Sequence, residues 1–228
     1  MTEDSKSNSA ELDRLVGIVH KNPENGDAHF DLGIFYGKIG SYEKAIKEFQ
    51  KAVRISPKNE ATRYNLGVFY FKLGKFPEAK KTYFDVLEIN PEYLAAHYGL
   101  GIIHNQLEEY EDAISCYQRV ANAKPNFAEV RYRLGIVYFL IEKYEDGIRA
   151  LKETIRIIPD HSEAHFNLSA GYDKVNDGKS AIIHMTISEL VFSQKGNKNR
   201  QDQCKEKLRL LYSKYNYLPE DFSLPPLD

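Results

Sequence analysis

The sequence has few cysteines, no long apolar run and almost no net charge, and each absence excludes a class of protein. Two cysteines, Cys116 and Cys204, cannot build a disulfide framework in 228 residues and are typical of a reducing compartment. No apolar run approaches the roughly 18 residues needed to span a bilayer. A net charge of −2 excludes a globally basic nucleic-acid-binding protein. We therefore expect no membrane insertion and no nucleic-acid partner.

The first nine residues, MTEDSKSNS, are polar and lack the basic and then apolar order of a secretory signal. The location that we predict is therefore the cytoplasm. Apolar residues make up 42% of the chain and charged residues 28%, which is ordinary for a folded protein. The length allows one large domain or a repeat array with a continuous core.

A period of 34 residues runs through the chain. Prolines recur at this interval at Pro23, Pro57, Pro91, Pro125 and Pro159. Leucines keep the same interval at Leu32, Leu66, Leu100, Leu134 and Leu168. Small residues form two further columns, the first at Gly33, Gly67, Gly101, Gly135 and Ser169 and the second at Ala45, Ala79, Ala113, Gly147 and Ala181. Coincident columns of this kind indicate a repeat array.

Each repeat is predicted to hold two helices, as residues 60–93 illustrate. Leu66, Gly67 and Tyr70 lie on one stripe of the first helix, at helical spacing. Gly74 ends that helix, and Pro77 falls in the first turn of the second helix, where its missing N–H does no harm. A glycine inside a helix costs about 1 kcal/mol relative to alanine. Its recurrence therefore indicates that the paired helices approach each other closely.

The columns resemble those of tandem tetratricopeptide repeats, a family with Leu-Gly, Tyr, Ala, an aromatic residue and Pro over 34 residues. The first repeat matches this pattern at Leu32, Gly33, Tyr36, Ala45, Phe49 and Pro57. The tryptophan that the family carries early in each repeat is absent, and its column holds His29, Arg63, His97, Arg131 and His165. The resemblance implies an all-α fold, a right-handed superhelical solenoid of stacked antiparallel helix pairs.

The predicted domain organisation follows from the period. Five repeats occupy residues 26–59, 60–93, 94–127, 128–161 and 162–195. Atypical ends are expected of capping segments in such arrays. We expect a disordered N-terminus at 1–9, an N-terminal capping helix at 10–25, a C-terminal capping helix at 196–216 and an extended tail at 217–228.

The first helix of each repeat carries a second apolar stripe, which in this family lines the concave surface that holds ligands. The resemblance implies that the peptide-binding residues are Phe30, Ile34, Tyr64, Asn65, Val68, Phe71, Lys72, Tyr98, Ile102, Tyr132, Arg133, Ile136, Phe139, Phe166 and Asn167. Aromatic residues in this column also pack the repeat, whereas the aliphatic column is not demanded by the repeat. We expect the groove to prefer an apolar helix or peptide, unless the C-terminal helix or tail of the chain covers it.

Some family members clamp a chaperone's C-terminal carboxylate with lysine, asparagine and arginine. In the first repeat those positions hold Phe30 and Ile34, and in the third they hold Ala95 and Gly99. Only Asn65 fits, so the resemblance gives no support for a carboxylate clamp.

Two short motifs could carry chemistry, and neither is complete. Gly178-Lys179-Ser180 resembles the end of a phosphate-binding loop, but the glycine required earlier is replaced by Asp173. His161 and His165 have a spacing that can bind a metal, but no third ligand is evident, and Ser162 is expected to cap a helix there.

Residues 195–214 carry a net charge of +5, which could contact an anionic partner but is typical of a solvated helix.

We therefore predict a non-catalytic protein-interaction module that needs no cofactor and no metal. Its partner would be a protein or peptide, bound as a peptide or an amphipathic helix in the concave groove. The alternative function is a self-associating scaffold, in which the ends of the array stack or the tail fills a neighbour's groove. An enzyme is the least supported reading, because no nucleophile and base can be paired from spacing.

Overall fold

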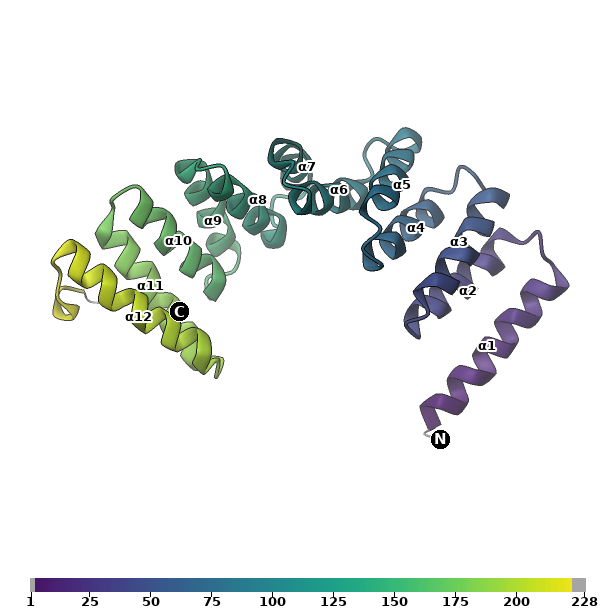
Figure 1. The fold of residues 1–228 in the computed structure, drawn as a ribbon, viewed down its shortest axis with the longest axis horizontal. Helices are drawn as coiled ribbons and strands as arrows, with labels where there is room; N and C mark the ends of the chain where they lie inside the picture. Colours follow the sequence, from purple (N-terminus) through teal and green to yellow (C-terminus); the bar gives the residue numbers. More distant parts are fainter. Residues whose placement is uncertain (1–2, 223–228) are drawn as a thin grey trace. The chain divides into compact units, whose positions relative to one another are not determined.

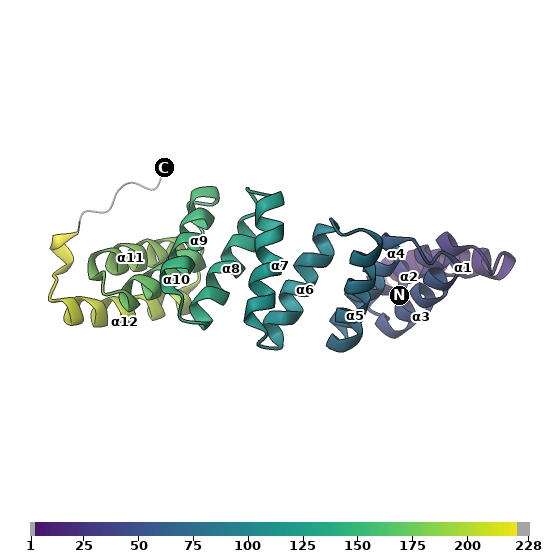
Figure 2. The ribbon, with the colours of Figure 1, turned by 90° about the horizontal axis from the view of Figure 1, so that it is seen from above.

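The computed structural model describes residues 3–222, and these residues form helices and no strand. The helices are α1 (Glu3–Lys21), α2 (Gly26–Lys38), α3 (Tyr42–Ile55), α4 (Glu60–Lys72), α5 (Phe76–Ile89), α6 (Leu94–Gln106), α7 (Tyr110–Ala123), α8 (Ala128–Leu140), α9 (Tyr144–Ile157), α10 (Ser162–Lys174), α11 (Gly178–Gln194), α12 (Lys198–Tyr215) and the 3-10 helix η1 (Pro219–Asp221). Short turns join them (Figures 1 and 2). None of the helices in the described part of the chain combines the length and the apolar character that a membrane span requires.

The chain forms two compact units, residues 1–103 (unit 1) and residues 104–228 (unit 2). In unit 1, α2 packs on α1 and α3, and α4 packs on α3 and α5. In unit 2, α8 packs on α7 and α9, α10 packs on α9 and α11, and α12 packs on α11. The predicted fold class, stacked antiparallel helix pairs, is thereby confirmed within each unit.

The small columns let large side chains fill the space between paired helices. Tyr83 is 3% exposed, and a Cβ atom on Gly67 or Gly99 would lie only 2.7 or 2.6 Å from its ring. Ala45 and Ala79 are fully buried. Close approach of the helices at the glycine and alanine columns is therefore confirmed, and any larger side chain at Gly67 would displace the tyrosine.

The column that lacks tryptophan has a hydrogen-bonding role in all five repeats. A side-chain N–H in this column lies against the carbonyl oxygen of the proline six residues earlier. The pairs are His29–Pro23 (2.9 Å), Arg63–Pro57 (2.6 Å), His97–Pro91 (2.9 Å), Arg131–Pro125 (2.8 Å) and His165–Pro159 (2.9 Å). A carbonyl oxygen only accepts, so each histidine must carry its proton on Nε2. The column is thus occupied by donors, and each donor ties a first helix to the turn that precedes it.

The two ends of the chain differ in detail from what the sequence predicts. Helix α1 begins at Glu3, seven residues ahead of the expected start. At the other end, η1 occupies part of the expected extended tail, and Asp221 accepts a hydrogen bond from the backbone N–H of Leu218 at 2.7 Å. Residues 1–2 and 223–228, where we expected disorder and an extended tail, lie outside the described residues.

The bond to the proline carbonyl predicts a difference between two substitutions at His97. The substitution His97→Phe keeps an aromatic ring but removes the donor, and should lower the free energy of unfolding by about 1 kcal/mol. The substitution His97→Trp restores the residue typical of the family and retains an N–H, so it should cost less. Urea unfolding of both variants measures the difference. Equal losses in the two variants would contradict the role assigned to the N–H.

Candidate functional site

The fifteen predicted peptide-binding residues all keep some exposure to solvent. Nine of them, from Phe30 to Ile102, belong to unit 1, and the six from Tyr132 to Asn167 belong to unit 2. Ile34 and Lys72 are exposed, and the other thirteen are half-buried. A half-buried row is what a surface needs if it is both to pack the repeat and to contact a partner.

The aromatic column leans onto the core in unit 1. The ring of Phe30 meets Phe49 edge to face at 5.6 Å, and Tyr64 lies 5.7 Å from Tyr83 and 5.3 Å from Tyr93. Burial raises the pKa of the Tyr64 hydroxyl, which therefore keeps its proton at neutral pH. These rings are held by packing and remain half-buried.

Three other predicted residues of unit 1 have local partners. Asn65 donates from Nδ2 to the carbonyl oxygen of Ala61 in its own helix, at 2.8 Å. The ring of Phe71 lies 5.5 Å from that of Phe76. The ammonium of Lys72 lies over the ring of Tyr42, at 5.3 Å. Part of the binding capacity expected from these side chains is thus already used within the unit.

A pocket in unit 2 brings together five of the six residues predicted there. Its volume is about 390 Å³, within the usual range for ligand pockets. Its lining consists of Asn105, Tyr132, Arg133, Ile136, Glu163, Phe166, Asn167 and Arg200. Helices α8 and α10 supply the apolar floor from the aromatic and aliphatic columns. The pocket is therefore the part of the predicted groove with a defined shape, and we refer to it as the unit 2 pocket.

Hydrogen bonds fix the polar edge of the unit 2 pocket. Asn167 donates from Nδ2 to the hydroxyl of Tyr132 at 3.1 Å and to the carbonyl oxygen of Glu163 at 2.9 Å. Both amide hydrogens are then engaged, so Asn167 can offer a ligand only its carbonyl oxygen. The Tyr132 ring stacks on His161 at 5.0 Å. Burial and the nearby Glu163 carboxylate raise the pKa of Tyr132, whose hydroxyl therefore stays protonated and able to donate.

Helix α12 closes one side of this pocket. The Arg200 guanidinium bonds the Glu163 carboxylate through Nε at 3.1 Å and through Nη2, and it lies 4.2 Å from the centre of the Phe166 ring. The ammonium of Lys207 also lies over Phe166, at 5.0 Å. Helix α12 therefore covers the ring of Phe166, one of the predicted peptide-binding residues. One sequence signal pointed there, since Arg200 follows Phe166 by one period of 34 residues.

Asn105 was also missed by the sequence reasoning. Its Oδ1 atom is buried at the pocket and has no hydrogen-bond partner among the described residues. It occupies the column of Phe71 and Phe139, one period from each. That column holds Gly37, Phe71, Asn105, Phe139 and Asp173, so its pattern does not single out Asn105.

Phe139 does not line the unit 2 pocket. A Cβ atom on Gly147 would lie 2.2 Å from the Phe139 ring, and a Cβ atom on Gly171 would lie 2.5 Å from it. The ring therefore fills the space that two glycines leave open, and it also lies 6.2 Å from Tyr144. The structure thus places Phe139 in the packing between helices, which explains why Gly147 interrupts the alanine column.

The motif of His161 and His165 does not bring the two side chains together as ligands. The Nδ1 atom of His161 accepts the N–H of Ala164 at 3.1 Å, so His161 caps α10 and the expectation that Ser162 does so is wrong. The reason is that the imidazole of His161 reaches the helix N-terminus, whereas Ser162 is buried in the first turn. His165 turns the other way and meets His184, with 2.9 Å between their Nδ1 atoms.

The pair of His165 and His184 is electrically neutral. Burial lowers the pKa of His165, and burial together with the neighbouring His165 lowers that of His184 to about 4. His165 carries its proton on Nε2, which bonds Pro159, so its Nδ1 is a bare acceptor. His184 must then donate from Nδ1. The His184 Nδ1–H therefore donates to His165 Nδ1, and a proton bound at His165 Nδ1 would remove the acceptor of this bond.

The phosphate-loop motif is likewise structural. Gly178 begins α11, and a Cβ atom there would lie 2.2 Å from the ring of Tyr215, so the glycine allows α12 to pack. Asp177 accepts the N–H of Ser180 at 3.0 Å as an ordinary helix cap.

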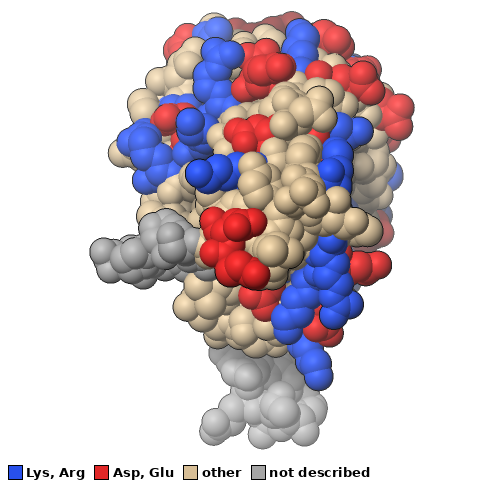
Figure 3. Space-filling model, turned by 90° about the vertical axis from the view of Figure 1, so that its left-hand side faces the viewer, with Lys and Arg blue, Asp and Glu red and all other residues tan. Residues whose placement is uncertain are grey.

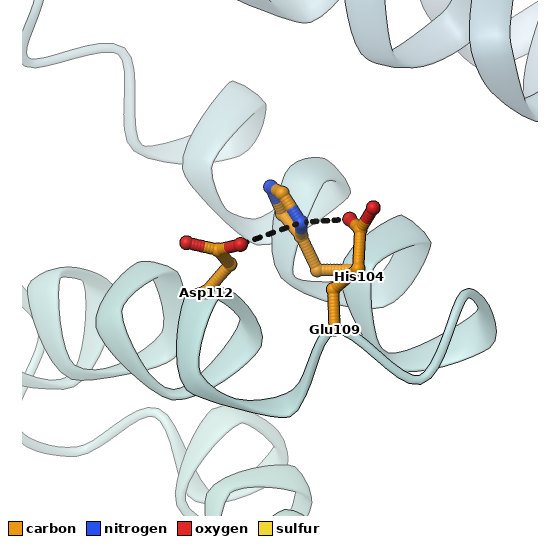
Figure 4. A group of neighbouring side chains, drawn as sticks. All are labelled: His104, Glu109 and Asp112. Atoms are coloured by element: carbon orange, nitrogen blue, oxygen red, sulfur yellow. Dashed lines mark hydrogen bonds and ion pairs between the residues drawn. The ribbon is translucent and has the colours of Figure 1, made fainter.

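One group of metal-ligand type occurs in the described part of the chain, formed by His104, Glu109 and Asp112 (Figure 4).

Comparisons with known proteins agree with this architecture. A tetratricopeptide-repeat family model matches residues 36–74 and 103–141, and a second matches residues 61–93. No curated protein sequence matches the chain.

Solved structures resemble the chain in fold. The crystal structure of MamA protein has a TM-score of 0.71 at 23% identity, over 75% of this chain and 94% of that chain. MamA from Desulfovibrio magneticus RS-1, from residue 41 onward, has a TM-score of 0.71 at 23% identity, over 74% and 96%. YrrB, described as a TPR protein with an unusual peptide-binding site, has a TM-score of 0.72 at 17% identity, over 84% and 97%. At such identities the likeness establishes the fold alone.

The neutral histidine pair predicts a loss of stability in acid. An unfolded histidine binds a proton near pH 6.5, whereas folded His184 stays neutral down to about pH 4, so the unfolded state gains protons first as the pH falls. The free energy of unfolding should decrease by roughly 2 kcal/mol between pH 7 and pH 5 through this group. In the variant His184→Gln the decrease should be smaller. Urea unfolding at pH 7, 6 and 5 measures it, with the exposed-site variant His20→Gln as control. Parallel curves for all three proteins would contradict the prediction.

Proposed function

The chain belongs to the tetratricopeptide-repeat family, and from this we propose that it is a non-catalytic interaction module whose unit 2 pocket holds an apolar side chain of a partner peptide. The observation that carries the proposal is the pocket itself, with an apolar floor and a fixed polar edge. Both features recur at interaction sites that accept one anchoring side chain.

The floor of the pocket suits an apolar anchor. Tyr132, Ile136 and Phe166 each keep part of their side chain exposed at the pocket. The tyrosine is held against His161, and the phenylalanine is held beneath Arg200. A ligand that enters would not have to order these rings first, which reduces the entropic cost of binding.

The polar edge suits a peptide group. The carbonyl oxygen of Asn167 can accept an N–H, and the Tyr132 hydroxyl, which accepts from Asn167, can still donate its hydrogen to a carbonyl oxygen. One acceptor and one donor match the two hydrogen-bonding groups of a peptide unit. This arrangement supports a peptide or helix terminus as ligand rather than a purely apolar molecule.

The cations of the pocket do not favour an anionic ligand. Arg200 is committed to Glu163, and Arg133 pairs with Glu129 at 2.7 Å in its own helix. Their charges are thus compensated before any ligand arrives. Together with the apolar residues at the carboxylate-clamp positions, this argues against recognition of a C-terminal carboxylate.

Unit 1 carries its own surface of the same type. The aliphatic column there consists of Ile34, Val68 and Ile102, and Ile34 is 40% exposed. We propose this row as a second apolar contact surface for a partner, next to the half-buried edges of Phe30 and Tyr64.

The alternative of self-association by stacked ends is less well supported. Helix α12 occupies the place of a sixth first helix, but the columns of Leu168, Ser169 and Tyr172 continue in it as polar residues. These are Asp202, Gln203 and Glu206, and all three are exposed. Figure 3, viewed from the end where α12 lies, shows acidic and basic side chains together on this face. A polar outer face is what a terminal cap needs to remain in solvent.

The proposal predicts that a charge in the pocket abolishes peptide binding. Peptides of twelve residues would be selected on the full chain by phage display, and their affinity measured by fluorescence anisotropy. The substitution Ile136→Asp should weaken binding at least about 30-fold, because a buried apolar anchor contributes roughly 2 kcal/mol or more.

The matched control is Leu140→Asp. Leu140 belongs to the same helix, is 52% exposed and does not line the pocket, so its substitution should leave the affinity unchanged. Selected peptides that bind Ile136→Asp as tightly as the unsubstituted chain would show that the pocket is not the binding site.

A further inference from the structure

Three side chains that can bind a metal converge at the turn between α6 and α7. His104 lies in the last turn of α6, Glu109 immediately precedes α7, and Asp112 lies in its first turn. Figure 4 shows the imidazole between the two carboxylates. The Nδ1 atom of His104 lies 2.6 Å from Oε2 of Glu109 and 3.8 Å from Oδ2 of Asp112. All three ligand atoms lie within 4.8 Å of one another.

The burial of the three residues differs in a way that suits a metal at the surface. The side chain of His104 is 5% exposed, whereas those of Glu109 and Asp112 are 37% and 69% exposed. The imidazole is therefore held in a fixed place by packing. The two carboxylates can adjust, and an ion there would remain accessible from solvent.

The repeat provides an internal comparison for this group, because the same three positions recur four more times on the same helix–turn–helix frame. The equivalent sets are Tyr36, Ser41 and Lys44; Tyr70, Lys75 and Glu78; Tyr138, Lys143 and Asp146; and Tyr172, Asp177 and Ser180. Only the third repeat has a histidine in the tyrosine column, and only there do ligand residues fill all three positions. The first, second and fourth repeats instead place a lysine in one of them.

The surrounding charge favours a cation. Residues 107–112, with the sequence LEEYED, contain four carboxylates and no basic residue. The two that are not in the group, Glu108 and Glu111, add to the negative field at short range.

We propose that His104, Glu109 and Asp112 form a binding site for a divalent transition-metal ion of the zinc class. One imidazole nitrogen and two carboxylate oxygens are ligands that such ions accept, at bond lengths of about 2.0–2.2 Å. Those lengths place ligand atoms roughly 3.3 Å apart in a tetrahedral site. The 2.6 Å pair would open and the 3.8 Å pair would close, which the exposed carboxylates allow. Water or a partner's side chain would complete the coordination.

The test is zinc binding by the full chain, measured by isothermal titration calorimetry and by the rise in melting temperature with zinc concentration. The variant His104→Tyr restores the residue that stands in this column in the other four repeats, so the fold should be retained. Its zinc affinity should be at least 10-fold lower than that of the unsubstituted chain. Glu109→Gln, which leaves His104 in place, should weaken binding by a similar factor.

The matched control is Glu111→Gln, which removes one charge from the same turn without removing a ligand. It should keep most of the zinc affinity. Loss of affinity in Glu111→Gln as large as in Glu109→Gln would indicate a diffuse electrostatic effect and overturn the site. Equal zinc binding by His104→Tyr and by the unsubstituted chain would also overturn the site. Absence of binding at millimolar zinc would do the same, because the three side chains would then interact only with one another.

Discussion

The hydrogen bond from a side-chain N–H to the preceding proline carbonyl ties the first helix of each repeat to the turn that precedes it. It spans six residues, so it closes the turn that leaves one helix pair and enters the next. In each repeat the donor is followed directly by a residue of the aromatic column, as Phe30 follows His29 and Tyr132 follows Arg131. Because neighbouring side chains on a helix point about 100° apart, orienting the donor toward the turn also orients the aromatic ring. The surface available to a partner thus depends on a bond made on another face.

Most of the fold could be predicted because the period places the same type of packing residue at equivalent positions in five repeats. The leucine, glycine and alanine columns specify which faces meet, and the column of Gly67 already implies that the paired helices approach each other closely. The donor column was harder to interpret. Histidine and arginine differ in size and shape from tryptophan, and what they share with it is an N–H at the right distance, which becomes visible only once Pro57 and Arg63 are placed side by side.

The candidate site was predicted less completely, for a physical reason. Columns describe positions that behave alike, whereas the unit 2 pocket depends on residues that depart from their columns. Arg200 stands in the aromatic column one period after Phe166, and it uses that position to cover the ring rather than to extend the row. Phe139 matches the pattern of a groove residue, yet Gly147 and Gly171 open a space that draws its ring inward. Both outcomes depend on contacts between different helices.

Helix α12 both caps the end of the array and lines the unit 2 pocket. Its first turn is tied to α10 by Arg200 and Glu163, and its last turn by Tyr215, whose hydroxyl lies 2.9 Å from Asp173. A helix fixed at both ends covers the apolar faces of α11, where Met185 is 1% exposed, and leaves a polar face outward. The same helix places Arg200 in the lining of the unit 2 pocket, beside Phe166. The helix that ends the array therefore also shapes the pocket. Arg200 stands in the aromatic column after Phe166 and at the same time forms a wall of the unit 2 pocket.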